Sequence, residues 1–321
     1  MEFRGNGALS RRDLLRLSAA TLATLPALDA LGAGSGFFAR HRLPLGLQLY
    51  TVTDTARTAL DDTLKRVADS GYQTIELAGL HGHTVPELRA AANRVGLKLV
   101  SIHVSADARP GELSLNGDIP ALAASAHQLG VTDVVLPMLS MPARLGGAAE
   151  REGFGAYLQR VVPQITAADW QRIAAQLNGY GRALQREGLK FGYHNHNPEF
   201  APLGDTNGFD ILVKETDPKA VSFELDIGWA AAGGHDPEQV IRHHAGRITQ
   251  LHVKDILATT KTNYALQQDP TEVGNGTLHW PALLETAYKT GIRRYFVEQE
   301  PPFKGNRFDS IAASARYLQS I

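Results

Sequence analysis

The side chains best suited to chemistry in this sequence are imidazoles and carboxylates that stand at the ends of short apolar runs. Such groups are costly in a core but suit a site that binds a cation or moves a proton. Because side chains alternate along a strand, His194 and His196 face one way, and Glu224 faces the same way as Asp226. The candidates, in chain order, are Glu76, His103, His194, His196, Glu199, Glu224, Asp226, His252, Lys254, Asp255, Glu298 and Glu300.

These residue types together point to a divalent metal ion. Imidazole nitrogens and carboxylate oxygens from four separate segments can surround such an ion and leave positions open for substrate oxygens. The chain contains no cysteine, so thiolate ligands, disulfides and a cysteine nucleophile are excluded. We therefore expect one divalent ion, and Mn, Co, Mg and Zn are all compatible with these ligands.

The elements that position these side chains alternate between two kinds. Short runs rich in β-branched or aromatic residues are followed by longer stretches with helical spacing, which is typical of βα units around a parallel sheet. The expected strands are Leu45–Tyr50, Gln73–Leu77, Leu97–His103, Asp133–Pro137, Leu189–His194, Val221–Asp226, Ile248–Val253 and Tyr295–Gln299. The expected helices include Leu60–Ala68, Val85–Val95, Ile119–Leu129, Ala167–Glu187, Glu238–His244 and Pro281–Lys289.

Glycine marks the ends of five helical stretches, where a left-handed cap would turn the chain into the next strand. The five dipeptides are Ser70-Gly71, Val95-Gly96, Leu129-Gly130, Glu187-Gly188 and Thr290-Gly291. Eight βα units in a chain of 321 residues match the size of a closed barrel, and no linker rich in proline or serine divides them. The sequence therefore predicts a single (β/α)8 barrel with the polar strand ends on one rim.

Two connections that follow expected strands are longer than a barrel needs. They are Met138–Thr166, rich in glycine and alanine, and Ile256–His279, rich in threonine, glutamine and asparagine. Both must lie at the carboxyl end of the strands, where active sites of this architecture are built. Long loops there usually cover the active site or line the substrate pocket, so we expect these two segments to decide substrate specificity.

The N-terminus predicts export. The segment Ser10-Arg11-Arg12-Asp13-Leu14-Leu15-Arg16 precedes an apolar, alanine-rich stretch that ends near Leu31, which is the pattern of a twin-arginine signal. Pro26 and Asp29 interrupt that stretch and argue against a stable membrane span, and an ordinary amphipathic helix is the alternative. We expect residues 1–40 to be a signal and linker read by the twin-arginine export machinery, residues 43–321 to be the barrel domain, and the protein to be periplasmic or exported.

Charge and composition limit the kinds of molecule that this protein is expected to bind. Lys and Arg total 32 and Asp and Glu total 33, without a basic stripe, so nucleic acid is not an expected partner. Hydrophobic residues make up 43% and charged residues 20%, which is typical of a globular chain. No arginine cluster or glycine-rich phosphate cradle is evident, so a phosphorylated substrate is not expected. The sequence is compatible with a monomer or an oligomer.

From Leu45 to its C-terminus the chain resembles the xylose isomerase-like barrels, which include sugar-phosphate isomerases and epimerases, inosose dehydratases and the endonuclease IV group. The resemblance implies a xylose isomerase-like TIM barrel and a sugar or polyol as substrate. The segments that carry it are Tyr193-His194-Asn195-His196, Glu224-Leu225-Asp226, Leu251-His252-Val253-Lys254-Asp255 and Val297-Glu298.

The resemblance also implies metal ligands at the ends of strands five to eight, usually Glu, Asp, His and Glu. Asp226, His252 and Glu298 match the last three of these. At strand five this chain has His194 in place of the glutamate, with His196 and Glu199 as alternative ligands. Because a two-base epimerase needs a carboxylate on each face of the sugar, this change argues against that mechanism and favours the inosose dehydratase branch.

For that branch the resemblance implies a metal-stabilised enediolate, formed when a base removes the proton next to a carbonyl. The base would be Glu298 or Glu199. Lys254 and His103 would steady developing charge or donate a proton. Alternatively, Lys254 pairs with a neighbouring carboxylate, Asp255 or Glu224, and His103 caps a loop.

Three further residues are expected near the substrate. Glu76 and His196 would bind its hydroxyl groups. Trp229 would either provide a stacking wall for a sugar ring or pack in the core, since a flat aromatic side chain suits both.

We therefore expect a metal-dependent isomerase, epimerase or lyase that acts on a free sugar, keto-sugar, glycoside or cyclitol. A sugar-binding barrel without catalysis is the first alternative, because His194 replaces the usual glutamate. A nuclease that cleaves at abasic sites shares the fold but needs three clustered metals and a basic groove. The near-neutral charge argues against it.

Overall fold

The computed structural model describes residues 36–107, 109–138 and 140–321. The twin-arginine segment at Arg11 and Arg12 lies outside these residues. Within them the chain forms one folded unit, Gly36–Ile321. Among the described residues, no helix combines the length and the hydropathy needed to cross a bilayer.

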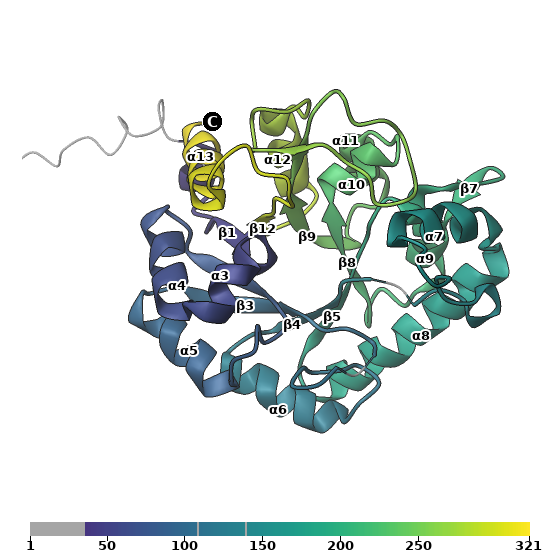
Figure 1. Ribbon diagram of the computed structural model, residues 1–321, viewed down its shortest axis with the longest axis horizontal. Helices are drawn as coiled ribbons and strands as arrows, with labels where there is room; N and C mark the ends of the chain where they lie inside the picture. Colours follow the sequence, from purple (N-terminus) through teal and green to yellow (C-terminus); the bar gives the residue numbers. More distant parts are fainter. Residues whose placement is uncertain (1–35, 108, 139) are drawn as a thin grey trace, which may run out of the picture. The chain divides into compact units, whose positions relative to one another are not determined.

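Eight parallel strands close into a barrel (Figure 1). Their order around it is β1-β12-β9-β8-β5-β4-β3-β2, so strands that are neighbours in the chain are also neighbours in the barrel. This confirms the predicted (β/α)8 fold. The barrel strands are β1 (Gly46–Gln48), β2 (Thr74–Ala78), β3 (Lys98–His103), β4 (Asp133–Leu136), β5 (Lys190–His194), β8 (Ser222–Asp226), β9 (Ile248–Val253) and β12 (Arg294–Val297).

Helices surround the barrel and cover the outer face of its strands (Figure 1). They bury their apolar side against the sheet, and the strands are apolar on that face, so both layers share one core. The covering helices are α4 (Leu60–Asp69), α5 (Val85–Arg94), α6 (Ile119–Leu129), α8 (Ala167–Arg186), α9 (Gly208–Glu215), α11 (Pro237–His243), α12 (Trp280–Lys289) and α13 (Arg307–Ser320). The shorter helices are α2 (Phe37–Arg40), η2 (Leu49–Val52), α3 (Thr53–Thr58), η3 (Ala143–Leu145), α7 (Phe154–Val161), η4 (Val162–Gln164), η5 (Pro198–Phe200) and α10 (Ile227–Ala232). Two small hairpins lie outside the barrel sheet: β6 (Pro202–Leu203) pairs with β7 (Thr206–Asn207), and β10 (Asp255–Ile256) pairs with β11 (Pro270–Thr271).

Local chemistry explains where these helices begin and end. Helix α8 begins with a capping box, in which the Thr166 side chain accepts from the Asp169 backbone N–H and Asp169 accepts from Thr166. Helix α6 ends at Gly130, whose φ of 81° is left-handed and turns the chain toward β4. The other four glycines expected at such turns also have positive φ: Gly71, Gly96, Gly188 and Gly291.

The folded unit begins earlier than the expected boundary at residue 43. Phe37 and Phe38 form the first turn of α2, and both are buried against Tyr295 of β12 with their rings edge to face. The Phe37 backbone N–H also donates to the carbonyl oxygen of Ile321 at the end of α13. The part of the expected linker from residue 36 to 40 therefore belongs to the barrel domain.

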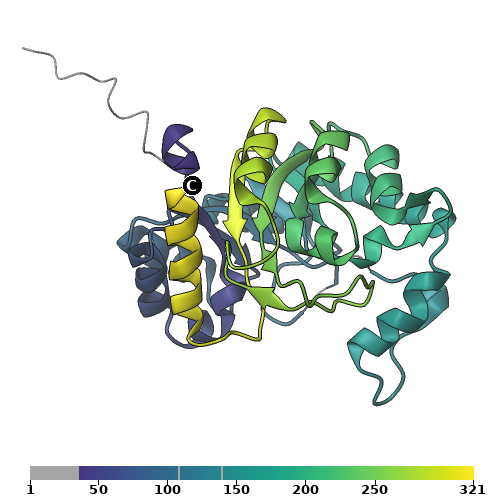
Figure 2. The same ribbon diagram turned by 90° about the horizontal axis from the view of Figure 1, so that it is seen from above.

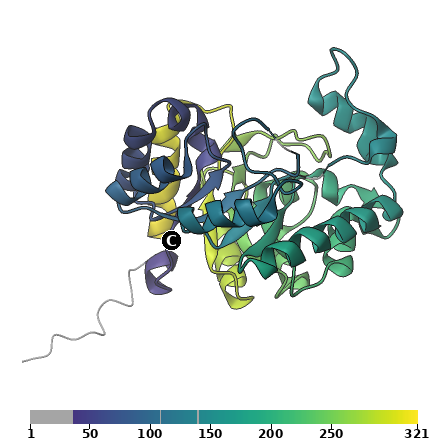
Figure 3. The same cartoon turned by 90° about the horizontal axis from the view of Figure 1, so that it is seen from below.

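The two long connections contain structure of their own. The first carries η3, α7 and η4, and it projects from the barrel beside α8 in Figures 2 and 3. Arg144 ties it to α8 through an ion pair with the buried Asp169. The second connection forms strand β11, which pairs with β10. Both segments therefore have a defined position at the carboxyl end of the barrel.

Candidate active site

Strand pairing brings the polar strand ends together at the barrel centre. In the parallel register His194 of β5 lies beside Glu224 of β8. Asp226, two residues further along β8, lies beside His252 of β9. Side chains of one face of a barrel strand point inward, so these residues meet inside the ring. Lys254 and Glu298 follow directly after β9 and β12 and reach the same place.

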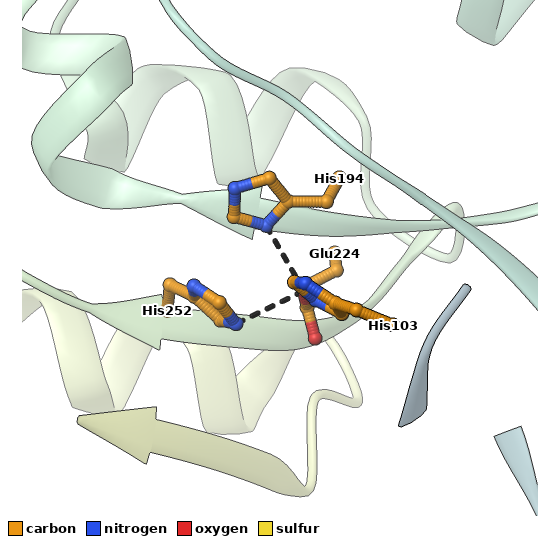
Figure 4. Close-up of side chains that lie close together, drawn as sticks. All are labelled: His103, His194, Glu224 and His252. Atoms are coloured by element: carbon orange, nitrogen blue, oxygen red, sulfur yellow. Dashed lines mark hydrogen bonds and ion pairs between the residues drawn. The ribbon is translucent and has the colours of Figure 1, made fainter. Parts of the chain in front are cut away.

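Three imidazoles converge on a single carboxylate oxygen (Figure 4). Oε1 of Glu224 lies 2.9 Å from Nε2 of His103, 3.0 Å from Nδ1 of His194 and 3.0 Å from Nε2 of His252. A carboxylate oxygen accepts hydrogen bonds, so each nitrogen that faces it carries a proton. The Gln250 amide donates to the other oxygen of Glu224 at 3.0 Å. Glu224 is fully buried and orients all three rings.

Glu76 is a second buried carboxylate beneath the imidazoles. Its Oε1 accepts from Nε2 of His252 at 2.7 Å and from the Gln48 amide at 3.0 Å, and it lies 3.1 Å from Nε2 of His103. Burial alone would raise the pKa of Glu76, but the charge of His103 and the hydrogen bonds from both imidazoles lower it well below its usual value. Glu76 therefore stays ionised and fixes the His252 ring from below.

Lys254 lies at the centre of a second cluster of charged side chains. Its buried ammonium lies 2.9 Å from Oδ2 of Asp226, 2.7 Å from Oε2 of Glu298 and 2.7 Å from Oε1 of Glu300. Burial alone would lower the pKa of Lys254, but the three carboxylates outweigh it and raise the pKa well above its usual value. The same contacts, with the charge of His252, hold the pKa of Glu298 far below the usual range. Lys254 thus keeps Glu298 ionised.

The ring nitrogens that face away from Glu224 point toward Asp226 and Glu298. Nε2 of His194 lies 4.0 Å from Oδ2 of Asp226. Nδ1 of His252 lies 3.7 Å from the same oxygen and 3.1 Å from Oε2 of Glu298. Burial, with the charges of the neighbouring His252 and His196, holds the pKa of His194 well below its usual value, and a neutral imidazole is the form that binds metals.

The donor set fits a divalent cation. Oδ2 of Asp226 is buried and accepts no hydrogen bond among the described residues, although Lys254 lies beside it. Donor atoms of Asp226, His252 and Glu298 all lie within 4.8 Å of one another. Glu224 faces Nδ1 of His194 and Nε2 of His252, the ring nitrogens opposite those that face Asp226. Carboxylates orient ligating imidazoles in this way. A second set, His103, His194, Glu224 and His252, is equally compact, but there the Glu224 oxygen already accepts from three rings.

A cavity of about 990 Å³ opens onto this centre. Its inner wall includes His103, His194, His196, Trp229 and Glu298. Trp229 is almost fully buried and packs with Ile256, so it serves the core and the wall together. Both long connections contribute to the outer wall, the first with Met138 and Phe154 and the second with Leu266.

The structure does not bring every expected residue to the cavity. Glu76 is completely buried below the imidazoles, so it has no access to substrate hydroxyls. Glu199 lies behind the wall, where it accepts from the Tyr193 hydroxyl and, at 3.1 Å, from the His196 backbone N–H. Neither is among the residues that line the cavity, and the same holds for the buried Asp226, His252 and Lys254. Glu76 and Glu199 both hold other groups in place, and their expected roles, Glu76 as a substrate ligand and Glu199 as a base or strand-five ligand, stay predictions.

The alternatives for Lys254 and His103 also differ from the structure. Lys254 does not pair with Asp255 or Glu224. Asp255 instead accepts from the Trp280 indole N–H at 2.8 Å and from backbone N–H groups of the second long connection. His103 caps no loop, since its Nε2 faces Glu224 and Glu76. Both residues therefore belong to the charged centre.

Sequence reasoning missed Gln48 and Gln250, the two buried amides that orient Glu76 and Glu224. Glutamine is seldom buried, so a glutamine within an apolar strand was the feature of the sequence that could have indicated these two residues. Two arginines were missed as well. Arg57 of α3 and Arg109 of the loop after β3 both line the cavity, and neither forms an ion pair within the described part of the chain. No sequence pattern links residues so far apart.

The environment of Glu199 gives a prediction for stability. Burial raises the pKa of Glu199 to about 7, although the Tyr193 hydroxyl opposes this. A raised carboxyl pKa means that its contribution is fully present below pH ~4.5, the unfolded value, and is lost as pH rises through about 7. We expect the unfolding free energy to fall by up to about 3 kcal/mol over this interval, and Glu199→Gln to remove that part of the fall.

Urea denaturation at pH 5 and pH 8 would measure this effect. Glu215→Gln, at an exposed position of α9, is the control and should keep the pH dependence of the unaltered protein. Identical pH dependence in the Glu199→Gln variant and in the unaltered protein would contradict the prediction.

Fold and site together define a class of protein. A closed parallel barrel with buried imidazoles and carboxylates at the carboxyl ends of its strands, open to a large cavity, has the construction of a TIM-barrel enzyme centre. The family model described as "Xylose isomerase-like TIM barrel" matches residues 64–321, and the chain belongs to that family.

Individual relatives are more distant. An inosose dehydratase of Geobacillus kaustophilus (strain HTA426) is 26% identical over 199 residues, which cover 61% of this chain and 62% of that protein. The chain thus spans less than two thirds of this relative. A solved sugar phosphate isomerase/epimerase from Parabacteroides distasonis ATCC 8503 is 25% identical with a TM-score of 0.68, covering 86% and 97% of the two chains. The IOLI protein, solved with a zinc atom, shares the fold at 16% identity and a TM-score of 0.61, covering 85% and 96%.

Proposed function

We propose that this protein is a metal-dependent enzyme that removes a proton next to a carbonyl group of a sugar or cyclitol, as an isomerase or a dehydratase. The observation that carries the proposal is the arrangement of His194, Asp226, His252 and Glu298. Oδ2 of Asp226 lies 4.0 Å from Nε2 of His194 and 3.7 Å from Nδ1 of His252, and Oε2 of Glu298 lies 3.1 Å from the same nitrogen of His252. His194 and Glu298 line the cavity, and Glu224 holds the two imidazoles from behind. The names of the relatives, inosose dehydratase and sugar phosphate isomerase/epimerase, support this class of substrate.

The four residues would hold one divalent ion, with Mn, Co, Mg and Zn as candidates. The IOLI protein, which shares the fold, was solved with a zinc atom, and this supports a metal in a barrel of this kind. Such an ion would act as a Lewis acid that polarises the substrate carbonyl. Glu224 faces one ring nitrogen of His194 and one of His252, and it thereby orients the other nitrogen of each ring toward the ion.

Proton removal is assigned to Glu298. Its carboxylate lines the cavity, and the contact with Lys254 keeps it ionised while it also lowers its pKa and with it its strength as a base. The Lys254 ammonium contacts Asp226 and Glu300 as well and steadies negative charge beside the reacting carbon. His196 offers a hydrogen bond to substrate, since it lines the cavity and its Nδ1 is without a hydrogen-bond partner among the described residues.

Dehydration fits the site better than two-base epimerisation. The end of β5 carries His194, where a two-base mechanism would need a carboxylate. Glu199, the nearest acid along the chain, is turned away from the cavity toward Tyr193. One base at Glu298 is enough to remove a proton, and the Lys254 ammonium beside it would stabilise the negative charge that develops.

Removal of metal tests the proposal. We expect the protein loaded with Mn²⁺, Co²⁺, Mg²⁺ or Zn²⁺ to exchange the proton next to the carbonyl of a keto-inositol or keto-hexose for deuterium, as followed by NMR in heavy water. Dialysis against EDTA should abolish the exchange, and one of the four ions should restore it. Undiminished exchange in metal-free protein would overturn the proposal. Sugar binding by calorimetry without exchange under any condition would favour a sugar-binding barrel instead.

A further inference from the structure

The cavity is larger than one sugar ring requires. Pockets that enclose a drug-sized ligand measure about 300–1,000 Å³, and the 990 Å³ of this cavity lies at the top of that range. The imidazoles and Glu298 occupy only its inner end. The outer wall is built from η2 and α3, from the loops after β2 and β3, and from the two long connections. Most of the residues that line the cavity therefore lie outside the proposed reaction centre.

Two exposed aromatic side chains line this same cavity. Tyr50 is 48% exposed and Phe154 is 50% exposed, and they are the only large hydrophobic residues with high exposure in the described part of the chain. Both belong to the cavity wall although they are 104 positions apart in the sequence. Because both belong to the wall of one cavity, their exposed surface is available to a bound ligand.

Tyr50 is held in a fixed position near the charged centre. It lies in η2, directly after β1, and its backbone N–H donates to Oε1 of Gln48 at 3.0 Å. Gln48 in turn donates to Glu76. Tyr50 lines the same cavity as Glu298 and Glu300.

Phe154 approaches the cavity from the first long connection. It is the first residue of α7, and one face of its ring stacks on Tyr157, with 6.1 Å between centroids and 23° between planes. Tyr157 is buried and its hydroxyl donates to the Gly146 carbonyl at 2.8 Å. The Tyr157 ring supports Phe154 from behind, which leaves the remaining surface of Phe154 for a ligand.

Leu266 adds an apolar contact from the second long connection. Its φ of 56° is left-handed, a conformation that a leucine adopts only where its surroundings impose it. Asn197, just after β5, accepts from the Leu266 backbone N–H at 3.1 Å and donates to the Asn263 carbonyl at 2.9 Å. These bonds hold the strained residue against the cavity.

We propose that the substrate contains two rings: a sugar or cyclitol ring that reacts at the metal centre, and a second ring with a flat apolar face that lies between Tyr50, Phe154 and Leu266. The second ring is the aglycone of an aryl glycoside or the second sugar of a disaccharide. Both present a flat face of C–H or aromatic carbon, which packs well on an aromatic side chain. The identity of the reacting ring rests on the proposed function, whereas the second-ring site rests on the cavity and its aromatics alone.

A calorimetric comparison of glycosides tests the second-ring site. The probes are methyl and phenyl glucopyranoside, both anomers, and cellobiose, each also with one ring hydroxyl oxidised to a ketone. We expect the full chain to bind the phenyl glycoside or the disaccharide at least tenfold more tightly than the methyl glycoside. Phe154→Ala and Tyr50→Ala should each reduce that preference about three- to tenfold and leave binding of the methyl glycoside unchanged. Phe154→Tyr and Tyr50→Phe retain the rings and should retain the preference.

Glucose 6-phosphate is the competing probe, because Arg57 and Arg109 line the same cavity. Tighter binding of this phosphate than of every two-ring probe would overturn the inference. So would equal binding of methyl and two-ring glycosides, no binding of any probe, or alanine variants that weaken all probes alike. A retained two-ring preference in a protein that never exchanges a proton would leave the second-ring site standing and remove the proposed function. Metal-dependent exchange without any two-ring preference would do the reverse.

Discussion

Asp226→Asn should abolish metal binding and proton exchange while it leaves the fold intact. Asp226 has two separate tasks. Its Oδ1 caps α10 by accepting from the Trp229 backbone N–H at 2.8 Å, and its Oδ2 faces the imidazoles and Lys254. Asparagine is as good an N-cap as aspartate, so the helix keeps its cap, but the negative charge at the centre is lost. Since removal of a group that merely orients a ligand costs about 10–100-fold in metal affinity, loss of this ligand should cost more than about 100-fold.

Metal content after dialysis and the exchange rate in heavy water measure this effect. Asp236→Asn is a matched control, because Asp236 caps α11 in the same way, with Oδ1 accepting from the Glu238 backbone N–H at 2.9 Å, and is exposed outside the barrel. That variant should bind metal and turn over normally. If Asp226→Asn retained full metal content, Asp226 would not be a ligand.

Lys254→Met should destabilise the protein strongly and slow proton exchange. The substitution removes the buried ammonium between Asp226, Glu298 and Glu300 but keeps most of the volume of the side chain. Removing one partner of a buried ion pair costs about 3–5 kcal/mol, because the remaining charges are left uncompensated. If Lys254 also donates a proton, the exchange rate should fall about 10²–10⁴-fold.

Added metal should distinguish these two effects. A divalent ion supplies positive charge to the same carboxylates, so saturating Mn²⁺ should restore more unfolding free energy to the Lys254→Met variant than to the unaltered protein. Exchange should stay slow in both conditions. Chemical denaturation with and without metal measures the first effect. Lys65→Met, which breaks an exposed pair with Asp69 on α4, should change neither quantity appreciably. A Lys254→Met variant as stable as the Lys65→Met control would contradict this account.

The strands and most helices could be predicted from the sequence because their signals are local. Ile248–Val253 and Ile119–Leu129 have the bounds expected from hydrophobic period and turn residues. Helices α7, α9 and α13 were not predicted, and α7 lies in a segment whose glycines and alanines hide its spacing. Its tertiary anchors, such as the ion pair of Arg144 with Asp169, are not visible in a local pattern.

The candidate site was likewise predictable in its residue types but not in its tertiary contacts. The residue types at the strand ends were visible in the sequence, and Asp226, His252 and Glu298 do lie within 4.8 Å of one another. Their ligand roles stay a prediction. Glu199 does not face the cavity for a physical reason: η5 turns the chain after β5, so this carboxylate contacts the Tyr193 hydroxyl instead. Glu76 is buried because β2 carries it one layer below the rim.

By itself the sequence determined the βα repeat and which ionisable groups stand at the strand ends, because alternation along a strand and helical spacing are properties of neighbouring residues. Only the tertiary structure decided which ring nitrogen of His252 faces Glu224 and which faces Glu298. It also decided that Tyr50 and Phe154 share one cavity. Such contacts depend on the register and closure of eight strands, and no segment of the chain carries that information alone.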